Sequence, residues 1–172
     1  MPKNHNGPVN AHRRDEKASP LIAWRKSADL SNEIINLVQF LEPTPEEIHA
    51  RTALVGQYRK IIHDNYEGSQ LFVFGSFATG LYTPWSDMDF VVLPSQPVEH
   101  TKGQIASRLS KIARKCYPFT RDLQILRRAR VPILKITDQS GYLIDLGYSG
   151  DNNQQRSVET VKERVIIIYI VE

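Results

Sequence analysis

The sequence predicts an α+β fold in which two helices precede a mixed, mainly antiparallel sheet with helices on one side. Three observations lead to this prediction. Apolar residues recur at helical spacing over residues 29–64, short β-prone runs dominate residues 70–148, and one helical pattern interrupts those runs. Helices that come first, followed by strands with a single helix among them, are typical of the α+β class.

The composition limits the class of protein. The 172 residues contain 22 Lys and Arg, 19 Asp and Glu, and a single cysteine, Cys116. A chain of this length can form one domain with its own core, and one cysteine excludes a disulfide framework or a CxxC-type zinc site. The longest apolar run, residues 165–171, is far shorter than the roughly 20 residues of a membrane helix. Because the N-terminus also has no apolar signal region, we expect a soluble, intracellular protein with no membrane partner.

The first predicted helix covers residues 29–41 and ends before Pro43. Its apolar residues recur at helical spacing: Leu30, Ile34, Val38 and Leu41. The second helix begins after Thr44, because Pro45 occupies the first helical position and Glu47 completes a capping box with Thr44. An apolar stripe carries this helix to about residue 64: Ile48, Val55, Tyr58 and Ile62.

Five short apolar runs follow, and we expect each to be a strand: residues 70–74, 87–93, 123–126, 131–137 and 142–148. A third helix over residues 101–115 separates the second strand from the third. The turn sequence DQSG at 138–141 indicates that the last two strands form a hairpin. The folded domain is therefore predicted over residues 28–150, between a disordered basic arm (1–27) and a divergent tail (151–172).

Positive charge is concentrated in residues 100–135, where ten basic residues accompany one acidic residue, Asp122. The basic residues are Lys102, Arg108, Lys111, Arg114, Lys115, Arg121, Arg127, Arg128, Arg130 and Lys135. Such a block suggests a polyanionic partner, although a solvated helix face next to a strand edge explains it equally well.

Two aspartates two residues apart, Asp87 and Asp89, form the most informative feature of the sequence. In a strand they share one face, about 7 Å apart, where their charges repel each other. A bound divalent cation would remove that repulsion. Oxygen ligands with no cysteine or histidine nearby suit Mg²⁺ or Mn²⁺ better than zinc.

Two further features complete the predicted site. Gly75 and Ser76 directly follow the first strand, where backbone N–H groups and a hydroxyl can contact a phosphate. Asp145 lies in an otherwise apolar strand, and a metal shared with Asp87 and Asp89 would offset the cost of burying its charge. A cluster of carboxylates beside a phosphate-binding turn is typical of active sites that catalyse phosphoryl or nucleotidyl transfer.

The Gly-Ser turn after a strand, the two aspartates and the later Asp145 together resemble the pattern of a known superfamily. Residues 71–92, LFVFGSFATGLYTPWSDMDFVV, resemble the signature of the DNA polymerase β-like nucleotidyltransferases. Within it the chain is most similar to the Trf-type (TRAMP-class) poly(A) RNA polymerases, since EPTPEE between the first two helices and RARVPILKITDQSGYLIDLGY at 128–148 also fit. The resemblance covers about residues 28–150 and implies the catalytic palm of that fold.

The resemblance also implies a mechanism and partners. Gly75 and Ser76 would contact the triphosphate of ATP, Asp87 and Asp89 would hold two Mg²⁺ ions, and Asp145 would be the third carboxylate. AMP would pass to an RNA 3′ end in nuclear RNA surveillance, with a zinc-knuckle RNA-binding protein and an RNA helicase as partners. Because the helical second domain of the family does not follow, we expect a truncated, weakly active product. The alternatives are a non-catalytic palm-fold binding module, or a compact nucleotidyltransferase acting on a small molecule or a protein.

Overall fold

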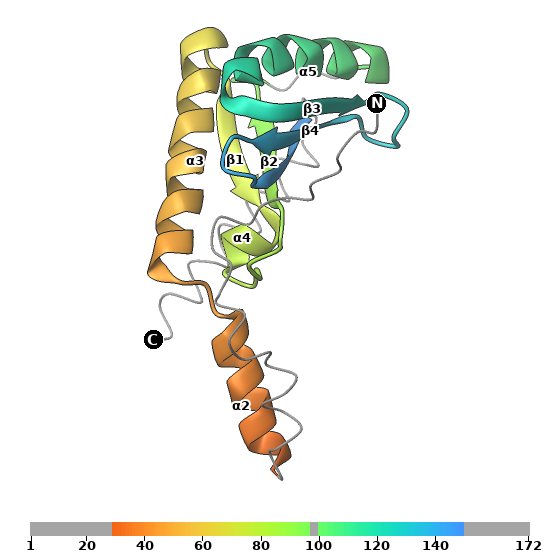
Figure 1. Ribbon diagram of the computed structural model, residues 1–172. Helices are drawn as coiled ribbons and strands as arrows, with labels where there is room; N and C mark the ends of the chain where they lie inside the picture. The colour runs from red at the N-terminus through yellow and green to blue at the C-terminus, as the bar shows by residue number, and fades with distance from the viewer. Residues whose placement is uncertain (1–28, 97–99, 150–172) are drawn as a thin grey trace, which may run out of the picture.

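The three predicted helices and five predicted strands follow one another in the predicted order, and short helices at residues 75–79 and 117–119 are added between them. The computed structural model describes residues 29–96 and 100–149, so the arm and tail predicted from the sequence lie outside the described residues. The helices are α2 (Leu30–Leu41), α3 (Pro45–Asn65), α4 (Gly75–Thr79), α5 (Lys102–Cys116) and the 3-10 turn η1 (Tyr117–Phe119) (Figure 1). The strands are β1 (Gln70–Phe74), β2 (Met88–Leu93), β3 (Thr120–Leu126), β4 (Ile133–Asp138) and β5 (Leu143–Tyr148).

The five strands form one sheet in the order β1-β2-β5-β4-β3. Three of the four neighbouring pairs are antiparallel, and β2 and β5 are parallel. The sheet is therefore mixed and mainly antiparallel, as the sequence predicts. The predicted hairpin of the last two strands is also confirmed, since β4 pairs antiparallel with β5.

Strand boundaries differ from the prediction by up to three residues. The second strand begins at Met88, so Asp87 belongs to the loop before it. The third begins earlier than predicted, at Thr120, because Thr120 pairs with Asp138 at the end of β4. The fourth begins at Ile133, directly after Pro132, which has no N–H group to donate within a sheet.

Two long helices cover one face of the sheet (Figure 1). Alternate residues of the central strands, such as Phe90 and Leu146, point toward α3 and α5 and are fully buried. From the helices, Tyr58, Ile62 and Leu109 complete this core. Ile48, which we predicted on the apolar stripe of α3, is 45% exposed, so that part of the prediction is wrong.

Both long helices begin with capping boxes. In α3 the Glu47 backbone N–H donates to Thr44 Oγ1 at 3.2 Å, and the Thr44 N–H donates to Glu47 Oε2 at 2.7 Å. Thr101 and Gln104 form the same arrangement at the start of α5. The predicted cap of α3 is therefore confirmed, and it sets where the helix starts relative to the sheet.

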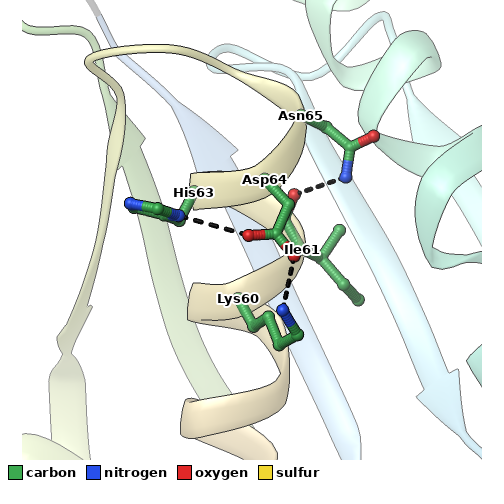
Figure 2. A network of polar contacts seen from close by, with 5 residues as sticks. All are labelled: Lys60, Ile61, His63, Asp64 and Asn65. Carbon is green, nitrogen blue, oxygen red and sulfur yellow. Dashed lines mark hydrogen bonds and ion pairs between the residues drawn. The ribbon is translucent and has the colours of Figure 1, made fainter.

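A polar network lies at the other end of α3 (Figure 2). Lys60 Nζ donates to Asp64 Oδ2 at 2.7 Å, His63 Nδ1 lies 3.2 Å from the other Asp64 oxygen, and Asn65 Nδ2 donates to the Ile61 carbonyl at 2.9 Å. The hydrogen bond from Lys60, followed by that with His63, lowers the pKa of Asp64. Because these groups are exposed, the network caps the helix end and adds little to stability.

Helix α2 extends away from the rest of the molecule (Figure 1). None of its residues is buried, and Leu30, Ile34 and Val38 on its apolar side are about half exposed or more. It contacts the loop between α4 and β2 through Phe40, whose ring centroid lies 6.1 Å from that of Trp85. Across the described ranges, no helix has the length and apolar character needed to span a bilayer.

Gly56 allows a test of how α3 is built. It lies on the exposed side of this helix, and no described heavy atom stands within 4 Å of the position that a Cβ would occupy. Replacing Gly56 by Ala should raise the free energy of unfolding by about 0.5–1 kcal/mol, because Ala loses less backbone entropy in a helix. Urea denaturation of both proteins measures this difference. An equal or lower stability of the Ala variant would contradict the helix described here.

Candidate active site

A row of paired residues crosses the whole sheet and carries the charged side chains. Asp89 on β2 is the register partner of Phe74 on β1 and of Asp145 on β5. Asp145 is in turn the partner of Lys135 on β4, which pairs with Gln124 on β3. Since neighbouring strands lie about 4.8 Å apart, the carboxylates of Asp89 and Asp145 start from adjacent backbone positions.

These side chains point away from the helices. Met88 and Phe90, on either side of Asp89, are buried in the core beneath α3 and α5. Ile144 and Leu146 flank Asp145 in the same way. Because successive residues of a strand face opposite sides, Asp89 and Asp145 share the face that α3 and α5 do not cover. The aspartates separated by 56 positions in the sequence are thus neighbours on this face.

The surroundings of Asp89 disfavour the ionised form of its carboxylate. Partial burial raises the pKa of Asp89, and the nearby carboxylates of Asp87 and Asp145 raise it further. Lys135 acts in the opposite direction but does not reverse the shift. Asp87 lies in the loop before β2, so Asp89 is affected by one carboxylate from this loop and one from β5. An additional cation would stabilise the ionised form of Asp89.

Lys135 is the nearest positive charge. Its Nζ lies 2.7 Å from both carboxylate oxygens of Asp145, and the two side chains are 46% and 21% exposed. At this exposure the pair contributes little to stability, on the order of 1 kcal/mol. The position of Lys135 opposite Asp145 could have been predicted, because the two residues are each five positions from Ser140 in the hairpin turn.

Gly75 makes the close approach of β1 to Asp89 possible. Its φ is +69°, and the Asp89 carboxylate occupies the space of a Cβ, with Cγ only 2.9 Å from that position. The short helix α4 starts here, with Ser76 as its second residue, and ends at Gly80, whose φ is +73°. The Gly75–Ser76 turn is thereby placed directly beside the carboxylate row.

The donor atoms fit a divalent cation of the Mg²⁺ type. Asp87, Asp89 and Asp145 offer only oxygen ligands, which Mg²⁺ and Mn²⁺ prefer. Burial raises the pKa of Asp89, and the neighbouring carboxylates of Asp87 and Asp145 add to that shift. Within residues 29–96 and 100–149, however, no three acidic, histidine or cysteine side chains already stand as a ligand group for one ion. Asp145 is engaged by Lys135 instead.

Comparison with known proteins shows which family the chain belongs to. A family model described as "Poly(A) RNA polymerase, mitochondrial-like, central palm domain" matches residues 30–154. The chain belongs to this palm-domain family. The match confirms the predicted nucleotidyltransferase palm and the resemblance to Trf-type poly(A) RNA polymerases.

Individual relatives agree with the family. Poly(A) RNA polymerase protein 2 of Saccharomyces cerevisiae is 31% identical over 124 residues, which are 72% of this chain and 21% of the yeast protein. The polymerase core of TRAMP, an RNA surveillance complex, is 28% identical with a TM-score of 0.62, covering 78% of this chain and 41% of that one. The structure of mtPAP in complex with UTP is 18% identical with a TM-score of 0.70, covering 86% and 34%, and shows the shared fold. The palm-domain chain spans about a fifth of the length of its curated relatives.

The two left-handed glycines of α4 form a matched pair for testing the approach of Asp89. Replacing either by Ala should cost about 1–2 kcal/mol, because both have positive φ. Only at Gly75 does the new methyl group meet Asp89; no described atom lies within 4 Å at Gly80. We therefore expect Gly75→Ala to lose about 1 kcal/mol more than Gly80→Ala in urea denaturation, because the strand must shift. Equal losses would show that Asp89 is not held against Gly75.

Proposed function

We propose that this chain is the catalytic palm of a divalent-metal-dependent nucleotidyltransferase that transfers AMP from ATP to RNA 3′ ends. The observation that supports the proposal best is the carboxylate row: Asp89 and Asp145 lie side by side next to the Gly75–Ser76 turn. The family match supports the same activity, because relatives are named poly(A) RNA polymerases. Activity, metal and substrate are proposals here, since the relatives are about five times longer than the part that matches.

Each group would have a defined task in this reaction. Asp87, Asp89 and Asp145 would hold the metal ions, which supply charge stabilisation to the attacking and leaving oxygens. Gly75 and Ser76 would offer backbone N–H groups and a hydroxyl to the triphosphate. Asp145 would also accept the proton of the RNA 3′ hydroxyl, and Lys135, now paired with Asp145, is placed to influence when that carboxylate is available.

The proposal includes Mg²⁺ as the physiological metal, ATP as the nucleotide and the nucleus as the place of action. As in the TRAMP polymerase core, which belongs to an RNA surveillance complex, partner proteins would be involved. We propose a zinc-knuckle RNA-binding protein and an RNA helicase. The structure of a GLD-2/RNP-8 complex shows that a related palm occurs together with another protein.

Metal binding is the first test. Mn²⁺ should bind the wild-type chain at least about tenfold more tightly than Asp89→Asn, which keeps the shape of the side chain but removes its charge. Isothermal titration calorimetry measures both affinities. The Asn variant should be at least as stable as wild type without metal, because the lost charge is partly buried and repelled by Asp87 and Asp145. Equal Mn²⁺ affinities in the two folded proteins would contradict the proposed metal site.

Activity is the second test. We propose that the 172 residues by themselves extend a labelled RNA by few or no adenosines, even with ATP and Mn²⁺. Much of the rate of such reactions comes from holding the triphosphate and the 3′ hydroxyl in line, and the palm supplies only part of that positioning. Extension is measured on denaturing gels, with Asp87→Ala as the control for contaminating polymerases. Robust extension that disappears in Asp87→Ala would show that the palm suffices.

A further inference from the structure

Arg51 of α3 is a charged side chain buried inside the protein. Only 1% of its surface is exposed, and it is among the largest fully buried side chains. Burial lowers the pKa of its guanidinium, against the influence of Tyr142, Tyr82, Glu47 and Asp87. Burying a charge is costly unless specific contacts compensate for it, so the contacts of Arg51 indicate what it does.

Those contacts join α3 to two other segments. Arg51 Nη2 donates to the carbonyls of Thr83 at 3.4 Å and Pro84 at 3.3 Å. The guanidinium carbon lies 4.9 Å from the ring centroid of Tyr82 and 5.0 Å from that of Tyr142. Tyr82, Thr83 and Pro84 belong to the loop before β2, and Tyr142 directly precedes β5. Arg51 thus connects the approaches to the two strands that carry Asp89 and Asp145.

Two ring contacts also hold the loop before β2: the ring centroid of Tyr82 lies 5.0 Å from that of Phe77 of α4, and the ring centroid of Trp85 lies 6.1 Å from that of Phe40 of α2. Between Gly80 and Asp87, Tyr82 is the one residue that is buried in the described structure, and Leu81 and Trp85 are 80% and 58% exposed. Thr83 and Ser86 form a local turn in which the Ser86 N–H donates to the Thr83 carbonyl at 3.0 Å. That turn shapes the loop but does not attach it to the sheet, and the next residue is Asp87. Asp87 thus lies between this turn and Met88, the buried first residue of β2, so contacts that hold Thr83 and Pro84 constrain Asp87 from the loop side.

The stability of the fold alone does not explain why an arginine occupies position 51. Its Nε and Nη1 are buried and have no hydrogen-bond partner among the described residues. Buried donors left without partners destabilise a protein, and an apolar side chain of similar size would avoid that cost. We infer that Arg51 is a positioning residue, which holds the loop at Thr83 and Pro84 and thereby fixes Asp87 opposite Asp89 and Asp145. The inference rests on the proposed function in that Asp87 is taken as a metal ligand.

The direction in which Mn²⁺ affinity changes in Arg51→Met shows whether Arg51 positions Asp87 or acts only through its charge. Arg51 is close enough to Asp87 for their charges to interact, and its positive charge repels a cation bound there. If Arg51 acted only through its charge, Arg51→Met would bind Mn²⁺ more tightly than wild type. If Arg51 positions Asp87, the same variant binds Mn²⁺ more weakly despite the lost repulsion. Arg51→Lys keeps the charge but lacks the planar group that reaches both carbonyls and stacks between the rings, so its affinity should be intermediate.

The experiment uses the 172-residue chain and a control on the same helix. Ile62→Ala removes a fully buried side chain of α3 roughly three turns beyond Arg51, so it destabilises the fold without touching the loop. Mn²⁺ affinity is measured by calorimetry for wild type, Arg51→Met, Arg51→Lys, Ile62→Ala and Asp89→Asn, with circular dichroism to confirm folding. We expect Arg51→Met to bind Mn²⁺ about tenfold more weakly than wild type, and Ile62→Ala to bind like wild type.

A second readout follows the loop directly. The chain has two tryptophans, Trp24 and Trp85, and Trp85 lies in the loop that Arg51 holds. In a Trp24→Phe background, the fluorescence anisotropy of Trp85 should fall in Arg51→Met and stay unchanged in Ile62→Ala. This readout does not depend on metal, so it tests positioning even if the metal site is absent.

The outcomes distinguish the inference from the proposed function. If wild type and Asp89→Asn bind Mn²⁺ equally, the proposed function fails, and Trp85 anisotropy alone decides the role of Arg51. If wild type binds more tightly than Asp89→Asn but Arg51→Met binds as tightly as wild type or more so, the inference is overturned. Should Arg51→Met not fold, Arg51→Lys takes its place, and unchanged affinity and unchanged anisotropy in that variant overturn the inference equally.

Discussion

The parallel pairing of β2 with β5, in a sheet that is otherwise antiparallel, is the constraint on which the site depends. It makes Asp89 and Asp145 direct cross-strand neighbours. Like charges in that relation are destabilising, so the surrounding residues must compensate. Lys135 pairs with Asp145 from the next strand, and Gly75 leaves the space that the Asp89 carboxylate fills. Lys135 and Gly75 thus reduce the cost of placing the carboxylates of Asp89 and Asp145 side by side.

The same strands also contain what offsets that repulsion. Met88, Phe90 and Val92 alternate with Asp89 and are fully buried against the helices, as are Ile144 and Leu146 beside Asp145. Each such side chain contributes about 1.5–3 kcal/mol on burial, so the helix-covered face can support a charged row on the other face. Because side chains alternate between the two faces of a strand, β2 and β5 can supply apolar residues to the core and the repelling carboxylates to the opposite face.

Much of this could be predicted from the sequence because the signals are local. The capping box of α3, the bounds of β1 and the hairpin at 138–141 each follow from a few adjacent residues. The pairing of Lys135 with Asp145 also follows from the register of this hairpin. Arg51 could not be predicted, because helical periodicity places it beside apolar residues and gives no sign of Thr83, Pro84 or Tyr142, which approach it only in the folded chain. For the same reason, the exposure of Ile48 depends on where the helix meets the sheet.

The basic block of residues 100–135 divides between the two faces of the sheet. Arg108, Lys111 and Arg114 are exposed on α5, in the helix layer, whereas Lys135 lies on the carboxylate face and is paired with Asp145. A continuous charge pattern in sequence is therefore not a continuous surface in space. Salt screens exposed charges more than a partly buried pair, so an attraction between α5 and a polyanion would depend on salt more than the pairing of Lys135 with Asp145 does. The exposed charges of α5 and the carboxylate row are therefore on opposite sides of the sheet, so a substitution on α5 leaves the row unchanged.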